Sequence, residues 1–194
     1  MMMPPISFIG NIGCGKSTWG KVLEQRGWIV YYEKLSEFSF LQEYWRNKAN
    51  PFQTQIEFYS SWLHQYIQAS KSENGLIDSS IISHHNIFTH KMLEEKLITQ
   101  QEYNLCDKLY NNILEVTNCR YVYLYCNCEE CLRRASVRAR ENELRNEQMI
   151  EYVQSRLQNI HDQCGQEMSV IDITNLSPKC DRDIDLFIRK IAGE

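Results

Sequence analysis

Residues Ile6–Ser17 read ISFIGNIGCGKS, and the last eight of them follow the pattern G-x-x-x-x-G-K-[ST]. The apolar, β-rich segment Ile6–Gly10 precedes the glycine-rich turn, and Thr18–Arg26 is predicted to follow it as a helix. Glycines in such a turn let successive backbone N–H groups point at phosphate oxygens, and the dipole of the following helix favours an anion. The stretch therefore predicts a strand, a loop and a helix that together bind a nucleoside triphosphate.

The lysine and the hydroxyl group that end the loop have expected roles in phosphate chemistry. Lys16 is expected to reach the outer phosphates, and Ser17 is expected to ligate Mg²⁺. A glycine-rich turn that binds nothing is the alternative, but it gives no reason for a lysine to follow the turn. The residues expected to bind the nucleotide are Gly10, Asn11, Ile12, Gly13, Cys14, Gly15, Lys16, Ser17 and Thr18.

Four further segments are continuous apolar runs like the first, which suits strands buried on both faces of a parallel sheet. They are Trp28–Glu33, Leu76–Ser80, Tyr121–Cys126 and Ser169–Ile173. Amphipathic helical patterns lie between them, the clearest at Pro51–Lys71, Thr99–Thr117 and Glu147–Gln163. Strands that alternate with helices predict an α/β fold, in which a five-stranded parallel sheet is flanked by helices and joined by right-handed crossovers. We expect residues 1–194 to form one domain.

The composition fits an ordinary globular domain of mildly acidic charge. Of the 194 residues, 43% are hydrophobic and 24% are charged, and the formal net charge is −4. Such a chain has no general attraction for nucleic acid or for anionic membranes. It also has no apolar run near the roughly 20 residues that a membrane span needs, and no targeting segment. We therefore expect a soluble, cytoplasmic protein that binds neither nucleic acid nor membrane.

The eight cysteines are irregularly spaced. Cys126, Cys128 and Cys131 form the one cluster with a spacing that suggests a metal. No second cysteine or histidine pair stands ready to complete a four-ligand zinc site. We therefore expect reduced cysteines at the end of a buried strand rather than a metal centre.

Two carboxylates stand at the ends of predicted strands, Glu33 after the second and Asp78 after the third. The crevice of a parallel α/β sheet lies at the carboxyl ends of its strands. In phosphoryl transfer one carboxylate can deprotonate an acceptor hydroxyl while another holds the metal. The alternative is that both acids simply face water.

A group of arginines follows the fourth predicted strand. Arg134 and Arg138 lie four residues apart, so they share one face of a helix. They are expected to belong to a lid that closes over the triphosphate and excludes water. The alternative is a solvated helix whose arginines pair with neighbouring glutamates. The arginines of this group are Arg133, Arg134, Arg138, Arg140 and Arg145.

From Ile6 to about Asp162 the chain resembles the deoxyribonucleoside kinase family, the relatives of thymidine and deoxyguanosine kinases. The resemblance rests on the phosphate loop and on Glu33, which is placed like the catalytic base of the family. It also rests on three short motifs: Pro51-Phe52-Gln53, Asp78-Ser79-Ser80, and Arg138-Ala139-Arg140 with Glu143.

This resemblance implies ATP-dependent phosphorylation of the 5′-hydroxyl of a deoxyribonucleoside, by an enzyme that is commonly a homodimer. The residues that it implies for charge stabilisation are Lys16, Arg138 and Arg140, with Arg134 at the nucleotide. It implies Ser17 and Asp78 as the residues that organise Mg²⁺. On the acceptor side it implies Glu33 as the base, Asp78 beside it, Gln53 at the nucleobase edge, Phe88 stacked on the base, and Tyr44 with Glu143 at the 3′-hydroxyl.

The sequence departs from this family at Ser79, where the family carries an arginine beside the developing charge. Four residues are candidates to replace that guanidinium group: Lys34, Arg46, His84 and His85. The positions where purine-type relatives often carry Arg and Asp hold Ser60 and His84, which weakens a purine assignment without establishing a pyrimidine.

Two other functions stay open at this stage. A nucleoside monophosphate kinase would share the fold, but it needs cations for the acceptor phosphate, and the acceptor side offers Arg46 and Lys48 but no clear cluster. A nucleotide-binding subunit with little transfer activity is the second alternative, and Ser79 favours it.

Overall fold

The sheet is the centre of this computed structural model, which describes residues 3–138, 147–164 and 168–193. Its five strands are all parallel and lie in the order β2-β3-β1-β4-β5. They are β1 (Ile6–Gly10), β2 (Ile29–Tyr31), β3 (Gly75–Ile77), β4 (Arg120–Tyr125) and β5 (Ser169–Asp172). The predicted α/β fold with a five-stranded parallel sheet is therefore confirmed.

Strands β2 and β3 end two and three residues earlier than the apolar runs predicted. Strand β2 lies at an edge of the sheet and pairs only with β3, through Tyr31 opposite Ile77 as the last pair. The backbone N–H of Asp78 still donates to the carbonyl of Tyr31 at 3.0 Å, and then the two chains separate. Glu33 and Asp78 therefore lie just beyond the strands, where the backbones of β2 and β3 diverge.

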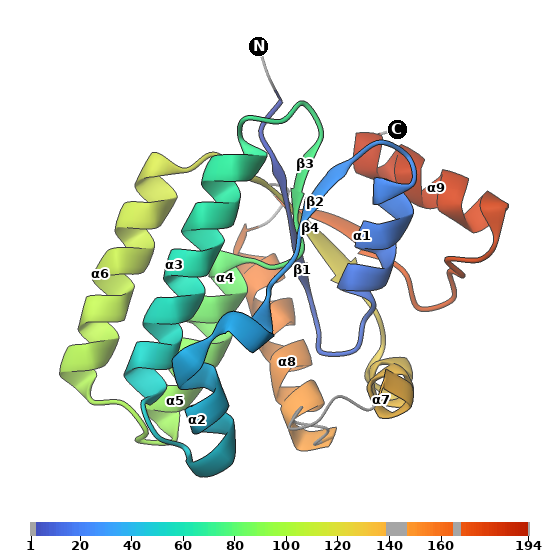
Figure 1. Ribbon diagram of the computed structural model, residues 1–194. Helices are drawn as coiled ribbons and strands as arrows, with labels where there is room; N and C mark the ends of the chain where they lie inside the picture. Colours follow the sequence, from blue (N-terminus) through green and yellow to red (C-terminus); the bar gives the residue numbers. More distant parts are fainter. Residues whose placement is uncertain (1–2, 139–146, 165–167, 194) are drawn as a thin grey trace.

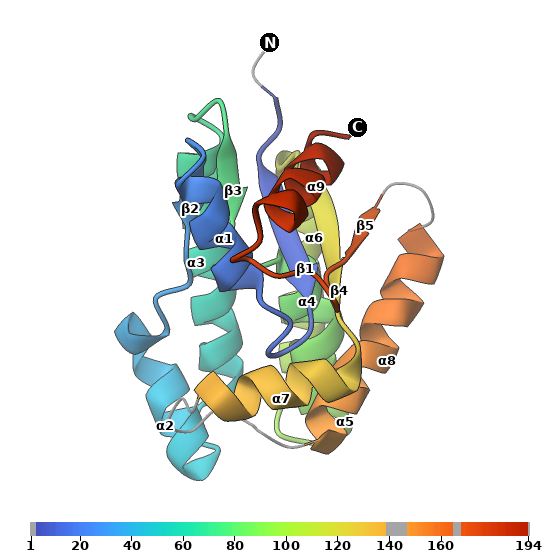
Figure 2. The same ribbon diagram turned by 90° about the vertical axis from the view of Figure 1, so that its right-hand side faces the viewer.

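Helices cover both faces of the sheet (Figures 1 and 2). One face is covered by α1 (Lys16–Glu24) and α9 (Asp181–Ala192), with the rings of Trp19 and Phe187 stacked 4.1 Å apart. The other face is covered by α3 (Pro51–Ala69), α6 (Gln100–Val116) and α8 (Glu147–Cys164). Each face has its own apolar core, so the sheet is buried on both sides, as continuous apolar strands require.

The long helices begin where the sequence signals predict. Pro51 opens α3, and Thr99 caps α6 by accepting from the N–H of Glu102 while the Glu102 side chain accepts from the N–H of Thr99. Helix α1 begins at Lys16, two residues before the predicted Thr18, because Gly15 enters it with φ at 113°. Helix α9 was not predicted, although its buried Ile184, Phe187 and Ile191 recur at helical spacing.

Short elements complete the fold around the carboxyl ends of the strands. Between β3 and α6 the chain forms α4 (Ile81–Ser83), a π-helix η2 (His84–Thr89) and α5 (His90–Glu94). A π-helix widens the helical turn and is often found at functional sites. The 3₁₀ turn η1 (Leu35–Glu37) and α2 (Ser39–Asn47) follow β2, and α7 (Cys128–Arg138) follows β4.

Two further expectations concern metals and membranes. In the described residues no group of three or more His, Cys, Asp or Glu side chains could hold a metal ion, and the seven cysteines with described side chains are free thiols. Among these same residues no helix combines the length and the apolar character needed to span a bilayer.

Candidate active site

The phosphate loop joins β1 to α1 and depends on glycine at two positions. Gly13 and Gly15 have φ angles of 76° and 113°, a region that residues with a Cβ rarely adopt. A Cβ on Gly13 would also collide with the carbonyl oxygen of Cys131 in α7, which passes beneath the loop (Figure 2). The loop is therefore held in its turn both by its own backbone and by the neighbouring helix.

The last two residues of the loop motif point in different directions. Lys16 Nζ donates to the carbonyl oxygens of Gly10 and Asn11, at 2.8 and 3.0 Å. Its ammonium group therefore lies over the loop that is expected to hold the phosphates. Ser17 Oγ donates to Asp78 Oδ2 at 2.6 Å and joins the loop to the end of β3.

The pair formed by Ser17 and Asp78 fits a magnesium ion. Mg²⁺ prefers oxygen ligands and is usually held by one or two protein groups together with phosphate oxygens. The pair offers one hydroxyl oxygen and one carboxylate, and Asp78 is buried at the carboxyl edge of the sheet. The residues present therefore match the chemistry of this ion.

Glu33 lies at the same edge, in contact with His84 at the start of η2. Glu33 Oε1 and His84 Nε2 are 2.7 Å apart, and both atoms are buried. Burial alone raises the pKa of Glu33, but His84, the Ser79 hydroxyl and the charge of Lys16 together outweigh burial. The net pKa of Glu33 is therefore below its usual value, and the group is a carboxylate at neutral pH.

Lys16, Ser79 and Glu33 lie near one another, because the neighbours Ser17 and Asp78 are hydrogen-bonded and Lys16 and Ser79 both lower the pKa of Glu33. The loop lysine, the position where the family carries arginine, and the predicted base all lie at one edge of the sheet. The chain brings them there from three separate loops, which follow β1, β2 and β3.

Arg134, in α7, forms hydrogen bonds with the phosphate loop and with the segment after β5. Its Nη1 donates to the carbonyl of Cys14 at 2.6 Å, and its Nη2 donates to the carbonyls of Ile173 and Thr174 after β5. Its Nε donates to Glu130 at 2.6 Å. Arg134 therefore ties the phosphate loop to two other segments.

The predicted lid is described only in part. Arg133 pairs with Glu130, as the solvated-helix alternative expected for this group. Helix α7 ends at Arg138, whose side chain lies outside the described residues, as do Arg140 and Glu143. The roles of these three residues stay predictions.

The acceptor-side predictions fall in different environments. Gln53 is exposed on the first turn of α3, whereas Gln55 is buried and its Oε1 accepts from the Thr89 hydroxyl at 2.9 Å. Phe88 is half-buried against the core cluster on the α3 side. Tyr44 is buried beside α5, and burial raises the pKa of its hydroxyl to about 12.

Two features of the site were not assigned from the sequence. Phe58 stacks on the His84 ring, with centroids 4.7 Å apart, and the sequence analysis assigned it no role. His84 was one of four candidates beside Ser79, and only the fold distinguishes it from the others. The pair His84-His85 belongs to no motif that would have selected either residue.

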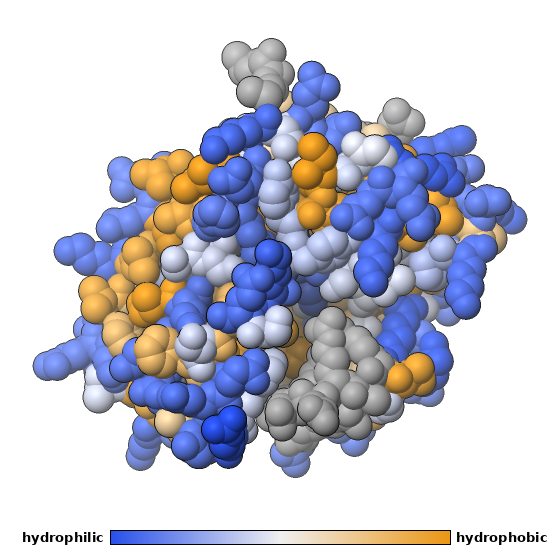
Figure 3. Space-filling model, viewed as in Figure 1, coloured by the Kyte–Doolittle hydropathy of each residue, from blue (hydrophilic) through white to orange (hydrophobic). Residues whose placement is uncertain are grey.

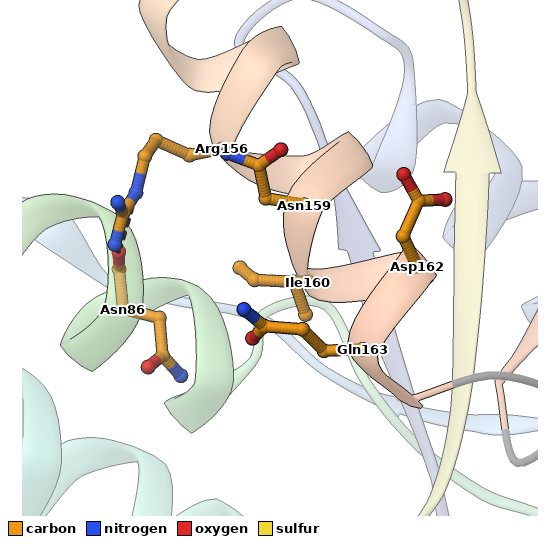
Figure 4. Close-up of a pocket in the computed structure, with 6 residues that line it drawn as sticks. All are labelled: Asn86, Arg156, Asn159, Ile160, Asp162 and Gln163. Atoms are coloured by element: carbon orange, nitrogen blue, oxygen red, sulfur yellow. Dashed lines mark hydrogen bonds between the residues drawn. The ribbon is translucent and has the colours of Figure 1, made fainter.

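A cavity of about 250 Å³ lies outside this site, between η2 and the second half of α8 (Figure 4). Arg156 donates from Nε and Nη2 to the carbonyl of Asn86 at its rim. None of its lining residues is a predicted site residue. They are Asn86, Arg156, Asn159, Ile160, Asp162 and Gln163.

Comparison with known proteins agrees with this geometry. Residues 6–190 match the family described as deoxynucleoside kinase. A protein of Invertebrate iridescent virus 3, named "Putative kinase protein 029R", is 31% identical over 147 residues, which are 73% of this chain and 74% of that protein. A deoxyadenosine kinase of Dictyostelium discoideum is 28% identical over 164 residues, 81% of this chain and 65% of that protein.

Solved structures share the fold. A deoxyadenosine kinase from M. mycoides, with dCMP and a flexible dCDP bound, superposes with a TM-score of 0.82 at 23% identity, over 98% of this chain and 100% of that one. The same enzyme with bound dATP superposes with a TM-score of 0.80 at 23% identity, over 97% and 99% of the two chains.

Proposed function

This chain belongs to the deoxynucleoside kinase family and phosphorylates deoxynucleosides with ATP, and we propose that the 5′-hydroxyl is the acceptor and Glu33 its general base. The single observation that supports this assignment most is the environment of Glu33. Its carboxylate lies close enough to the phosphate-loop Lys16 for that charge to lower its pKa. A base at this place faces both the acceptor and the end of the triphosphate.

The transfer balances as a direct displacement. The 5′-hydroxyl oxygen bonds to the γ-phosphorus while the bond from that phosphorus to the bridging oxygen of ADP breaks. The hydroxyl proton passes to the Glu33 carboxylate and then to solvent. Lys16 stabilises the charge on the phosphates, and the loop N–H groups orient them.

Mg²⁺ would be held by Ser17 and Asp78, and when bound it neutralises charge on the phosphate oxygens. Asp78 would also place the acceptor hydroxyl near Glu33. Arg138 and Arg140 would add positive charge from the lid, and Glu143 with Tyr44 would hold the 3′-hydroxyl. Gln53 and Phe88 would contact the base.

A panel of substrates tests which nucleobase the acceptor nucleoside carries. Two of the relatives carry the name deoxyadenosine kinase, so deoxyadenosine is the first substrate to assay. One solved structure of the M. mycoides enzyme also holds dCMP, which makes deoxycytidine the second. Deoxyguanosine and thymidine complete the panel, with the 5′-monophosphate identified by mass.

Replacing Glu33 with Gln tests the base assignment. The variant keeps the shape and hydrogen bonding of the side chain but loses the proton acceptor. General-base catalysis contributes about 10²–10⁴-fold, so kcat on the best deoxynucleoside should fall by that factor while the KM for ATP stays nearly constant. A variant as fast as the wild type would exclude Glu33 as the base.

A homodimer is proposed from the surface of α3 and α6. Hydrophobic side chains gather over these helices in Figure 3, and Ile67, Leu105 and Val116 are exposed there. Exposed apolar patches of this kind often mark protein–protein contacts. Light scattering of the purified protein should give twice the mass of 23.0 kDa, and Leu105→Glu should shift it toward the monomer.

A further inference from the structure

The contact between Glu33 and His84 joins the loop after β2 to the first residue of η2. The side chain of His84 is only 7% exposed, and that of Glu33 is 21% exposed. The oxygen that meets His84 is the buried Oε1. The carboxylate therefore meets His84 through Oε1, and Oε2 is the oxygen that can face an acceptor.

The imidazole ring packs against an aromatic ring, and hydrogen bonds fix the backbone of the same residue. Phe58 stacks on it at 4.7 Å with an interplanar angle of 26°, and Phe38 packs edge-on against Phe58. The backbone N–H of His84 donates to the carbonyl of Ser80 at 3.1 Å. The hydroxyl oxygen of Thr89 lies 2.9 Å from the carbonyl oxygen of His84. The ring has little freedom to turn away from Glu33.

The other candidates for the missing guanidinium group are engaged elsewhere or exposed. Lys34 pairs with Glu37 at 3.3 Å and its side chain is 70% exposed. His85 points into the core, where Nδ1 contacts the Tyr59 hydroxyl and Nε2 contacts Asp107. Arg46 is exposed on α2. His84 is thus the candidate whose ring nitrogen lies against the Glu33 carboxylate, at 2.7 Å.

We infer that His84 is the positioning residue of the acceptor site, which holds Oε1 of Glu33 so that Oε2 faces the acceptor hydroxyl. This inference rests on the proposed role of Glu33. It also explains how the site can work with Ser79 in place of the family arginine. A histidine from η2 contacts the carboxylate that an arginine beside Asp78 would otherwise contact. A displacement of about 1 Å in a reacting group can cost about 10²-fold in rate, so such support has a measurable effect.

A double-mutant cycle tests this positioning role. The four enzymes are the wild type, Glu33→Gln, His84→Leu and the double variant, each assayed for kcat and for the KM of ATP. We expect His84→Leu to lower kcat by about 10–100-fold with little change in the KM for ATP. In the Glu33→Gln background the same substitution should have almost no effect, because no proton acceptor is left to position.

Conservative and control variants separate positioning from folding. His84→Gln places an amide donor near the position of Nε2 and should keep more of kcat than His84→Leu does. His90 forms another histidine–glutamate pair, with Glu94 at 3.2 Å, outside the site. His90→Leu should leave kcat unchanged. If His84→Leu does not fold, His84→Asn repeats the cycle with a shorter amide that cannot reach Oε1.

The last part of the experiment replaces His84 with an arginine at position 79. Ser79 is buried at 5% exposure, so Ser79→Arg alone should crowd His84 and lower kcat. In the His84→Ala background the same arginine should reach Glu33 and recover part of the lost kcat. Recovery in that background and loss in the wild type would together support the inference.

The outcomes distinguish this inference from the function on which it rests. Glu33→Gln with wild-type kcat overturns the base assignment itself. If Glu33→Gln is slow, and adding His84→Leu to it lowers kcat by the same factor as in the wild type, the positioning role alone is overturned. A Ser79→Arg enzyme faster than the wild type overturns it as well, because the site would then have needed a cation that His84 does not supply.

Discussion

The phosphate loop and the acceptor edge, by which we mean the carboxyl ends of β2 and β3 with Glu33 and His84, are built in different ways. In the loop, Lys16 makes its hydrogen bonds to Gly10 and Asn11, a few residues earlier in the chain. At the acceptor edge, the contact of Glu33 with His84 joins segments that are distant in the sequence. A local arrangement leaves a motif in the sequence, whereas a distant one leaves only scattered residues.

The two adjacent histidines of η2 show the same contrast within one turn. His84 faces the acceptor edge, and its neighbour His85 enters a buried network with Tyr59 and Asp107. Burial lowers the pKa of His85, and Asp107 opposes this effect only in part. Identical side chains therefore acquire different roles from the direction in which the helix presents them.

The largest expected effect is that of a substitution in the phosphate loop. Lys16→Ala should lower kcat by about 10³-fold or more while the protein stays folded, because the lysine stabilises charge on the transferred phosphate. Steady-state kinetics and thermal unfolding of the same preparation check both statements. Full turnover in this variant would show that the loop does not bind the triphosphate.

A smaller effect is expected at the binding site for the deoxynucleoside. Gln53→Ala should raise the KM for the deoxynucleoside by about tenfold, near 1.4 kcal/mol, and leave the KM for ATP unchanged. Gln55→Ala is the matched comparison. It removes the buried acceptor of the Thr89 hydroxyl and should cost about 1–3 kcal/mol of unfolding free energy. Equal effects of Gln53→Ala on both KM values would show that Gln53 does not touch the acceptor.

The smallest expected effect concerns Glu130, which supports the loop from α7. Hydrogen bonds from Arg133, and then from Arg134, lower the pKa of Glu130 to about 2. Because the folded pKa is depressed, the pair stabilises the protein above the ordinary value of 4.5, and this contribution is lost as the pH falls toward 2. The site is close to the surface, so the contribution is no more than about 1 kcal/mol.

Chemical denaturation at several pH values measures this contribution. The difference in unfolding free energy between the wild type and Glu130→Gln should be present at pH 7 and vanish toward pH 2. Arg134 also donates to the carbonyl of Cys14 in the loop. We therefore expect the variant to raise the KM for ATP slightly. A difference that is constant over this pH range would contradict the assignment of the low pKa to Glu130.

The amino-acid sequence by itself determined the α/β fold, the phosphate loop and the limits of the long helices. Continuous apolar runs, helical periodicity, and the caps at Pro51 and Thr99 are local signals, and each depends on neighbouring residues alone. The sequence also placed Glu33 and Asp78 at the carboxyl edge of the sheet, because parallel strands bring their loops to one side.

Only the tertiary structure decided which side chains meet at that edge. It selected His84 from four candidates, buried Gln55 rather than Gln53, and used Arg134 to hold the carbonyl of Cys14. The physical reason is that a side-chain contact depends on the rotation of each helix and on the length of each strand. Strands β2 and β3 end early and η2 winds more widely than an α-helix, and neither property is visible in the residues that come to face each other.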